Sequence, residues 1–422
     1  MKRLFFLSMF FALIAGVAFA ADVGAEIIGM TDILSGDSTE NSKVQAGGWP
    51  GGLRRARAYA GGQNDEGTFG GWFRFETYGP GNPNFHGNAW WKPIDQFKLM
   101  LGVNPDGDYS RDGVARWGFY QVGGDADVVK ENWKFGASFY EGWSQNGALL
   151  TLTPVENLLI FMGIPFSSGG EAADVFAKLH AQVAYDISGI GNFALTYTGG
   201  LGHKDAVAGT PGSSSGYDWI DHDNNPATPP QWGPVPGGIT GGSGEVNDPG
   251  KLFVYFGLSA IENLGVDIGL GYTLPYTQED KTTVNTPFAL GLGLKFDAGA
   301  FGVKARLQGE LGGSKKYDSG AEWKDPTVIV FDILPYYAIN DSLTALLSAG
   351  LEITSHGDNN YGPAGKPETV TGWHVEPYVT VKSSWWAPNF YAGLRIESDG
   401  IKGADDKTVT KWSVPIGVVF SF

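Results

Sequence analysis

Apolar and polar residues alternate along most of the chain. A β-strand points successive side chains to opposite faces of its sheet, so each alternating segment has one apolar and one polar face. The clearest apolar faces are Val175, Ala177, Leu179, Ala181, Val183 and Tyr185; Leu264, Val266, Ile268, Leu270 and Tyr272; Phe288, Leu290, Leu292, Leu294 and Phe296; Phe301, Val303, Ala305, Leu307 and Leu311; and Leu343, Ala345, Leu347, Ala349, Leu351 and Ile353.

The length of these segments favours a membrane-spanning sheet. Strands in soluble proteins are usually about five or six residues long, whereas tilted strands of about 9–11 residues cross a bilayer. A sheet in lipid must close on itself, because every backbone polar group there needs a partner. The alternative, a soluble sandwich, predicts shorter strands and a polar outer face. We therefore expect an all-β transmembrane antiparallel up-and-down β-barrel with an even number of strands, about 18 in a range of about 16–20.

The connections between the segments alternate between short turns and long polar loops, as in outer-membrane barrels. The longest loop spans about residues 201–250, and residues 104–133 form either an outer loop or a segment folded into a pore. Paired tryptophans, Trp90-Trp91 and Trp385-Trp386, lie near strand ends, where interfacial aromatic girdles occur. The short turns are 153–156, 188–191, 262–263, 297–299, 340–341 and 387–389.

The first 20 residues have the features of an export signal. Lys2 and Arg3 precede an apolar run from Leu4 to Phe19, and Ala18-Phe19-Ala20 forms a small-x-small cleavage site. This pattern predicts a cleaved secretory signal peptide. The expected domains are therefore residues 1–20 as signal peptide, cleaved after Ala20, and residues 21–422 as the barrel.

Composition narrows the classes of protein further. The 422 residues carry a formal charge of −16, whereas a nucleic-acid binder shows a basic patch or stripe. There is no cysteine, which excludes disulfides, thiolate metal sites and a cysteine nucleophile. The 64 glycines are about twice the usual share and are expected in turns and at inward positions, where a missing side chain leaves a channel open.

The last strand carries a family resemblance. Trp412, Val414, Ile416, Val418, Phe420 and Phe422 share one face. A final amphipathic strand ending in Phe resembles the assembly signal of Gram-negative outer-membrane barrel proteins, which implies recognition by the barrel-assembly machinery. Pro415 is unusual within such a strand, because it contributes no hydrogen bond to the ladder.

The whole chain after residue 20 then resembles an outer-membrane porin. The stretches 91–95 (WKPID) and 103–107 (VNPDG) are similar to porin-like proteins of spirochaetes. Trimeric general porins carry a Pro-Glu-Phe-Gly-Gly motif in a third loop folded into the channel, and this chain has no such motif. A homo-oligomer is left open.

If the apolar parity faces lipid, the opposite parity lines a lumen. Charged rings set the selectivity of pores, so these residues are the candidate ion or solute filter; the alternative is a lining that only pairs within itself. Basic residues gather in the first and last strands, so we expect Arg55, Arg57 and Arg74 to approach Lys382 and Arg395 when the barrel closes. The expected lining residues are Arg55, Arg57, Arg74, Glu76, Lys98, Lys178, His180, Asp267, Lys295, Lys304, Arg306, Glu310, Asp332, Glu352, Glu376, Lys382, Arg395 and Glu397.

Two further features bear on what passes through such a pore. An inward fold of residues 104–133 would bring Asp106, Asp108, Arg111, Asp112 and Arg116 into a constriction. Inward aromatic residues could form a sugar-stacking path, although such residues more often form girdles or plugs. The aromatic candidates are Trp72, Tyr78, Tyr140, Tyr255, Tyr378 and Tyr391.

Enzyme and metal motifs are weak. Residues 212–216 (GSSSG) match a nucleophile-elbow pattern, but they lie in a Gly/Pro loop rather than on a strand-to-helix turn. Residues 221–225 (DHDNN) begin like a calcium loop, yet Pro226 and Trp232 replace the Gly and Glu that such a loop requires. We expect no enzyme, no cofactor and no metal.

The sequence therefore predicts an outer-membrane porin for passive diffusion of ions and small hydrophilic solutes. Outer-membrane lipid is its expected surroundings, and no nucleic acid is expected as a partner. The alternatives are a sugar- or anion-selective channel, a surface adhesin or antigen that uses the loop at 201–250, and a membrane-embedded hydrolase.

Overall fold

The computed structural model describes most of the expected strands and the turns between them. The segment at 1–20 and the candidate constriction at 104–133, with its five charged residues, lie outside the described residues. The described ranges are 22–38, 45–46, 53–77, 83–103, 146–166, 178–199, 202–204, 210–211, 217–220, 231–234, 239–240, 246–248, 250–277, 283–285, 288–316, 322–324, 327–355, 369–382, 389–402 and 408–421.

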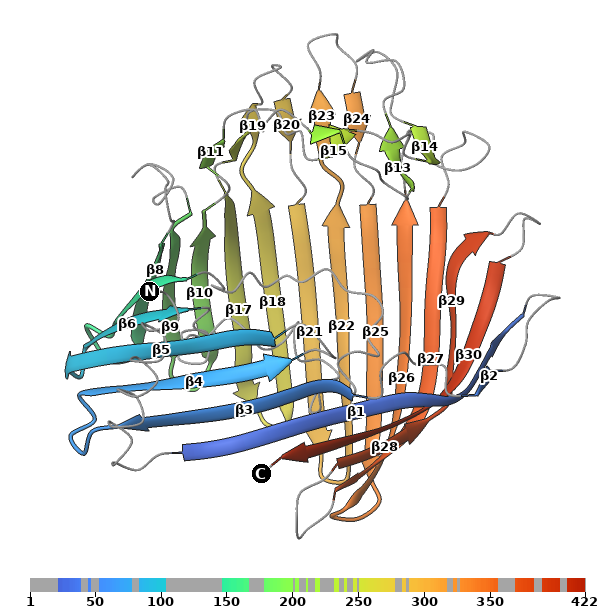
Figure 1. Ribbon diagram of the computed structural model, residues 1–422, viewed down its shortest axis with the longest axis horizontal. Coiled ribbons are helices and arrows are strands. Elements are labelled where there is room, and N and C mark those ends of the chain that lie inside the picture. Colours follow the sequence, from blue (N-terminus) through green and yellow to red (C-terminus); the bar gives the residue numbers. More distant parts are fainter. Residues whose placement is uncertain are drawn as a thin grey trace.

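One antiparallel sheet contains nearly all the long strands (Figure 1). Each strand pairs with its neighbours along the chain, the pattern of an up-and-down sheet. Its strands are β1 (Asp22–Asp37), β2 (Gln45–Ala46), β3 (Leu53–Gln63), β4 (Phe69–Thr77), β5 (Pro83–Ile94), β6 (Phe97–Val103), β7 (Gly147–Leu152), β8 (Leu158–Pro165), β9 (His180–Ile187), β10 (Gly191–Thr198), β17 (Lys251–Ile261), β18 (Leu264–Thr273), β21 (Phe288–Ala298), β22 (Phe301–Leu311), β25 (Thr327–Ala338), β26 (Leu343–Ser355), β27 (Thr369–Lys382), β28 (Asn389–Gly393), β29 (Arg395–Lys402) and β30 (Thr408–Ser421).

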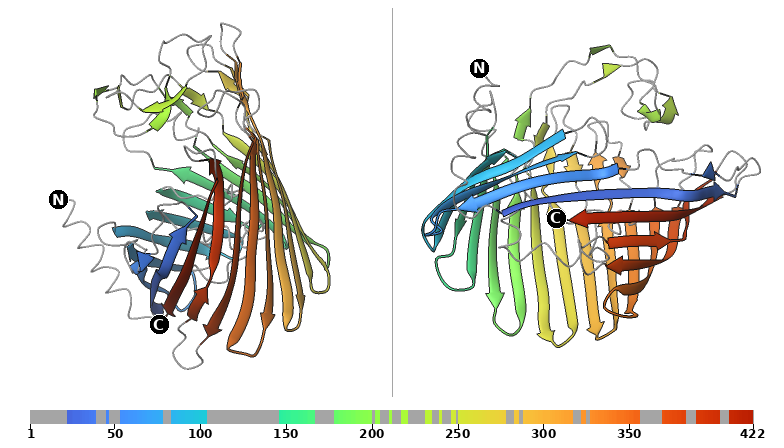
Figure 2. Two further views of the ribbon diagram at one scale, coloured as in Figure 1. Left: turned by 90° about the vertical axis from the view of Figure 1, so that its right-hand side faces the viewer. Right: turned by 60° about the horizontal axis from the view of Figure 1, so that its bottom comes forward.

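The sheet closes because its first and last strands pair. β1 pairs with β3 along one edge and with β30 along the other, with Glu26 opposite Ser421. Strands β1 to β5 cross β21 to β27 at a steep angle, so the sheet curls round on itself (Figures 1 and 2). The predicted antiparallel up-and-down barrel is thereby confirmed.

In the described residues the ring contains 18 strands, in agreement with the expected even number. Of the 20 strands in the sheet, β2 adds only two residue pairs beside the end of β1 and does not form a separate member of the ring. β28 and β29 are halves of one strand, since both pair with β27 and β30 in a continuous register. The strand is interrupted at Leu394, whose N–H donates to the carbonyl of Pro377 at 3.0 Å. Pro377 has no N–H with which to return that bond.

Turn lengths alternate as predicted. Ile261 and Leu264 pair across a two-residue turn, in which Asn263 has a φ of +64°, a conformation that Asn tolerates. Small accessory strands lie beyond the long-loop end of the barrel (Figure 1), and those at 202–248 belong to the predicted longest loop. They are β11 (Gly202–Lys204), β12 (Thr210–Pro211), β13 (Tyr217–Ile220), β14 (Gln231–Pro234), β15 (Ile239–Thr240), β16 (Val246–Asp248), β19 (Tyr276–Thr277), β20 (Thr283–Asn285), β23 (Ser314–Lys316) and β24 (Glu322–Lys324).

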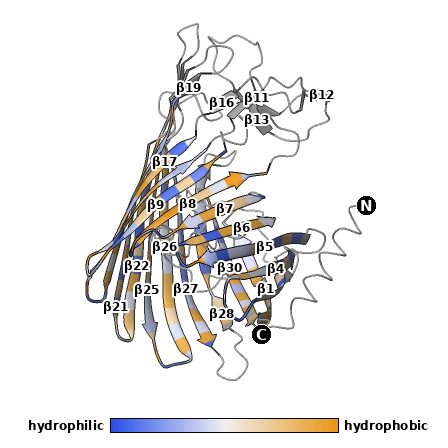
Figure 3. Cartoon of the chain, turned by 90° about the vertical axis from the view of Figure 1, so that its left-hand side faces the viewer, coloured by the Kyte–Doolittle hydropathy of each residue, from blue (hydrophilic) through white to orange (hydrophobic). Residues whose placement is uncertain are grey.

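The barrel is apolar outside and polar inside, the reverse of a soluble protein. On β22, Lys304, Arg306 and Gln308 are buried, whereas Phe301 and Leu307 are exposed. The same alternation runs through β18, β21 and β27 (Figure 3). The period-2 pattern therefore assigned the two faces of these strands correctly.

Three strands depart from that alternation. Met100 on β6, Leu149 on β7 and Phe161 on β8 form a buried apolar cluster with Trp90 packed against it. β7 and β8 carry almost no polar side chain on either face, so parity alone could not orient them, whereas on β6 Met100 shares the parity of Lys98, which was expected to face inward. The expected girdle pair also separates, because Trp91 is 52% exposed on the outer face whereas Trp90 lies on the inner face.

One expectation about a strand end is modified and one about Pro415 is confirmed. The alternation predicted a strand from Val175, but in the described residues Lys178 and Leu179 precede β9, which begins at His180. Pro415 does lie within β30, opposite Asp32 of β1. The β1–β30 register shifts directly after that pair, as expected where a ladder donor is missing.

Part of the glycine excess makes room for aromatic rings. Five described glycines lie directly opposite an aromatic residue of the neighbouring strand, whose ring atoms come within 3.0 Å of where a Cβ would stand. A Cβ at any of these positions would clash with the ring, which would have to move. The pairs are Gly24–Tyr59, Gly36–Trp412, Gly70–Trp90, Gly271–Phe253 and Gly302–Tyr336.

Gly191 should be the glycine least tolerant of substitution in the β9–β10 turn. Its φ is +155°, and a Cβ there would stand 1.8 Å from the carbonyl oxygen of Gly257. Gly189 in the same turn has a φ of +72° but nothing within 4 Å. We expect Gly189→Ala to cost about 1–2 kcal/mol and Gly191→Ala markedly more in urea unfolding of the refolded protein. Equal costs would contradict the role of the Gly257 carbonyl.

Candidate functional site: the inner wall

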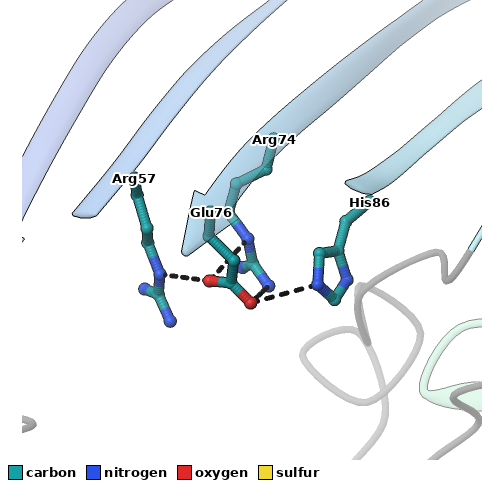
Figure 4. Close-up of polar contacts among 4 residues, drawn as sticks. All are labelled: Arg57, Arg74, Glu76 and His86. Atoms are coloured by element: carbon teal, nitrogen blue, oxygen red, sulfur yellow. Dashed lines mark hydrogen bonds and ion pairs between the residues drawn. The ribbon is translucent and has the colours of Figure 1, made fainter. Parts of the chain in front are cut away.

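A cluster of four ionisable side chains lies on the inner face of β3, β4 and β5 (Figure 4). Glu76 is 1% exposed, and its carboxylate accepts from Arg57 Nε at 2.8 Å. Arg74 Nε lies 3.3 Å and His86 Nε2 lies 3.1 Å from the same carboxylate. The register brings them together, since Arg57 is opposite Glu76 and Arg74 is opposite His86. One buried carboxylate thus holds two guanidinium groups and an imidazole.

A second group of charged residues lies across β22 to β29. Arg306 Nε donates to Asp332 Oδ2 at 2.5 Å, and these residues are directly opposite in the sheet. Arg395 Nε donates to Glu376 Oε2 at 3.1 Å. A Cβ on Gly350, which is opposite both Asp332 and His374, would stand 2.3 Å from atoms of each, so these two side chains meet over a glycine.

In every one of these pairs the acid lies deeper than the base. Exposure of the carboxylate side chains is 1% for Glu76 and 0% for Glu376, whereas that of Arg57 and Arg395 is 22% and 21%. A guanidinium on its longer stem reaches past an Asp or Glu that lies against the wall. At these pairs the inward surface therefore presents guanidinium groups above buried carboxylates, although the chain as a whole is acidic.

Further polar contacts, one of them to the carboxylate of Asp267, extend the lining over β9, β10, β17 and β18. Gln182 Nε2 donates to Thr196 Oγ1 at 2.9 Å, and His180 Nδ1 lies 3.0 Å from Thr198 Oγ1. The Tyr255 hydroxyl donates to Asp267. These contacts join neighbouring strands across this part of the inner wall.

The predicted lining residues differ in how deeply they lie. Lys304, Arg306, Glu76 and His180 are buried. Lys295 and Lys382 are exposed near strand ends, and Lys178 lies before β9. Arg57, Arg74, Lys98, Glu352 and Arg395 are partly buried, while Arg55 and Glu310 lie in β3 and β22 with side chains outside the described residues.

The basic residues of the first and last strands lie in the same part of the ring but do not come into the close contact that was expected. Arg55 and Lys382 share one transverse row of the sheet through Ile28, Val419 and Asn389. Four steps of about 4.8 Å place their backbones about 19 Å apart. The arginines of the two regions instead pair with acids on their own neighbouring strands.

The inward aromatic residues form no continuous track in the described part of the wall. Tyr378 and Tyr391 pack with ring centroids 5.1 Å apart, while Tyr255 bonds to Asp267 some strands away. Tyr78 and Tyr140 lie outside the described residues. The sequence did not predict that Trp90 faces inward. Trp91 is next to it, and the pattern alone does not say which of two adjacent tryptophans faces inward.

Neither metal ligation nor a helical span is seen where the structure is described. Those residues include no group of three His, Asp or Glu side chains placed to hold a metal ion. The same ranges contain no helix long and apolar enough to cross a membrane.

A search of protein-family models and a search of curated proteins each return no match to the chain. Among solved structures the chain is similar to an anion-selective porin from Comamonas acidovorans, with 11% identity, a TM-score of 0.45 and coverage of 96% of this chain and 100% of the porin. It is also similar to the outer membrane protein opdK from Pseudomonas aeruginosa, with 9% identity, a TM-score of 0.47 and coverage of 95% and 99%. Likeness at this level assigns neither a family nor a function.

Proposed function

We propose that the protein is an outer-membrane porin that lets ions and small hydrophilic solutes diffuse passively, with a preference for anions. The observation that carries the proposal is the closed ring of 18 strands with apolar side chains outside and charged side chains inside. A large apolar outer surface is unfavourable in water and favourable in lipid, and a charged residue facing the bilayer midplane would cost about 2–4 kcal/mol. The inner face has no comparable need for charge unless water reaches it.

The preference for anions follows from the depth of the ion pairs. The arginines at the inner surface screen the carboxylates beneath them, so a passing ion meets positive charge first. Rings of charged side chains set ion selectivity in this way. The net charge of −16 then describes mainly the loops and turns.

The wild-type protein should form channels in a planar bilayer and select chloride over potassium. We expect the reversal potential in a KCl gradient to have the sign of anion selectivity, despite the acidic composition. Cation selectivity would contradict the proposed inner surface. A bilayer that never conducts would contradict the porin itself and favour an adhesin or a membrane hydrolase.

We further propose the steps that bring the chain to its membrane. Residues 1–20 would direct export and be removed after Ala20, and residues 21–422 would form the barrel. The terminal strand ending in Phe422 would be recognised by the barrel-assembly machinery. Mass spectrometry of the mature protein from outer membranes checks the cleavage site.

A further inference from the structure

An unpaired amide lies on the inner wall between two tryptophans. Asn88 on β5 is 8% exposed, and neither its Oδ1 nor its Nδ2 has a hydrogen-bond partner in the described structure. A buried amide without partners costs free energy, so such groups are rare and call for an explanation. One explanation is a ligand that completes the bonds.

The neighbours of Asn88 are those of a binding site for a ring. Trp72 on β4 lies directly opposite Asn88, and Trp90 is two residues along β5 on the same face. On the other side Asn88 is opposite Gly102, which is in turn opposite Gly147. Two adjacent positions of this row therefore carry no side chain, next to an amide with free donors and a free acceptor.

Each indole carries a cation over its face. Arg74 Cζ lies 5.9 Å from the ring centroid of Trp72, and Lys98 Nζ lies 5.4 Å from that of Trp90. Both distances are within the range of cation–π contacts. The positive groups therefore flank the amide on both sides along the strands, with Glu76 as the acid in contact with Arg74.

We propose that Trp72, Asn88 and Trp90 form a subsite for a sugar acid, a hydroxylated ring with a carboxylate. The C–H face of the ring would pack on an indole, its hydroxyls would bond to the amide, which offers two donors and an acceptor, and its carboxylate would pair with Arg74 or Lys98. A neutral sugar has no carboxylate to pair with Arg74 or Lys98. A small carboxylate such as acetate has no ring to pack on an indole and no hydroxyl to bond to the Asn88 amide.

The proposed subsite rests on the proposed channel function. One measurement distinguishes failure of the subsite from failure of the channel. Ion current through the refolded full-length protein is recorded in KCl while D-galacturonate, D-galactose or acetate is added. We expect galacturonate to block the current at concentrations at least about tenfold lower than the other two solutes, a difference of one charge-assisted bond. Current without any galacturonate block overturns the subsite alone, and absence of current overturns the channel.

Substitutions at the subsite test whether galacturonate blocks the current by binding there. Asn88→Leu and Trp72→Leu should each weaken galacturonate block by about tenfold. Asn192→Leu is the matched control, because Asn192 on β10 also has an unpaired Oδ1 but lies opposite Asp186 and Gly257 rather than a tryptophan. It should leave the block unchanged.

Two outcomes would overturn the assignment. If Asn88→Leu is blocked like the wild type, the amide is satisfied by water rather than by solute. If galactose blocks as strongly as galacturonate, the cations have no part in binding. Should Asn88→Leu fail to refold, Asn88→Ser, which keeps a smaller polar group, is expected to weaken the block in the same direction.

Discussion

Replacing Asp332 with Asn should destabilise the barrel by about 3–5 kcal/mol, the usual cost of removing one partner of a buried ion pair. Arg306 is 9% exposed and Asp332 is 0% exposed, so the guanidinium left behind gains little solvation from water. Asn can still accept one hydrogen bond, but it cannot neutralise the charge. The measurement is urea unfolding of the refolded protein, followed by tryptophan fluorescence. The shift in midpoint reports stability if the dependence of the unfolding free energy on urea concentration is the same in both proteins.

An exposed ion pair provides the matched control for that substitution. Lys295 Nζ lies 3.1 Å from Asp297 Oδ2, with exposures of 58% and 42%. Asp297→Asn should change stability by no more than about 1 kcal/mol, as is usual for exposed pairs. If the two substitutions cost the same, Arg306 must acquire another counter-charge in the variant, and the pair would not be essential to the wall.

The double variant Arg57→Gln with Arg395→Gln should lower the ratio of chloride to potassium permeability by about fivefold. A unit charge about 4 Å from a passing ion contributes about 1 kcal/mol in water, which is about a fivefold change. These two are the most exposed of the arginines in the inner ion pairs. Their loss uncovers the carboxylates of Glu76 and Glu376.

A second double variant separates position from net charge. Lys92→Gln with Lys295→Gln removes the same formal charge, but these lysines pair with exposed Asp95 and Asp297 near short turns, and Lys295, although an expected lining residue, is 58% exposed and lies three residues from the end of β21. Screening limits their reach to about 10 Å at 0.1 M salt, so the permeability ratio should change by less than about twofold. Equal shifts in the two doubles would mean that total charge, not the inner arginines, sets selectivity.

The alternation predicted the inner and outer faces of a strand correctly wherever one face is polar. Lys304 and Arg306 alternate with apolar residues on β22, and the structure buries them as parity predicts. Phe161 was not readable in this way, because β8 is apolar on both faces and period 2 then favours neither orientation, whereas Met100 shares the inward parity of Lys98 on β6. Trp90 and Trp91 show the same limit, since adjacent residues must point apart but pattern alone does not say which points inward.

Contacts between strands depend on register, which a single sequence does not contain. Arg306 and Asp332 are 26 residues apart, and a slip of one residue would place them on opposite faces. Glu76 likewise contacts three cations only because β3, β4 and β5 align in one register. Asn88 carries no recognisable motif, and its lack of a partner is visible only once its neighbours are placed.

The sequence by itself determined the class of fold, an even strand number in the range of about 16–20 and which face of most strands is polar, because these follow from period, segment length and the need to pair every backbone group. Only the tertiary structure decided which acid holds which base, that each carboxylate lies beneath its arginine, and that Asn88 is left between two tryptophans. Those features depend on how neighbouring strands align, and residues far apart in the chain meet only after the ring has closed.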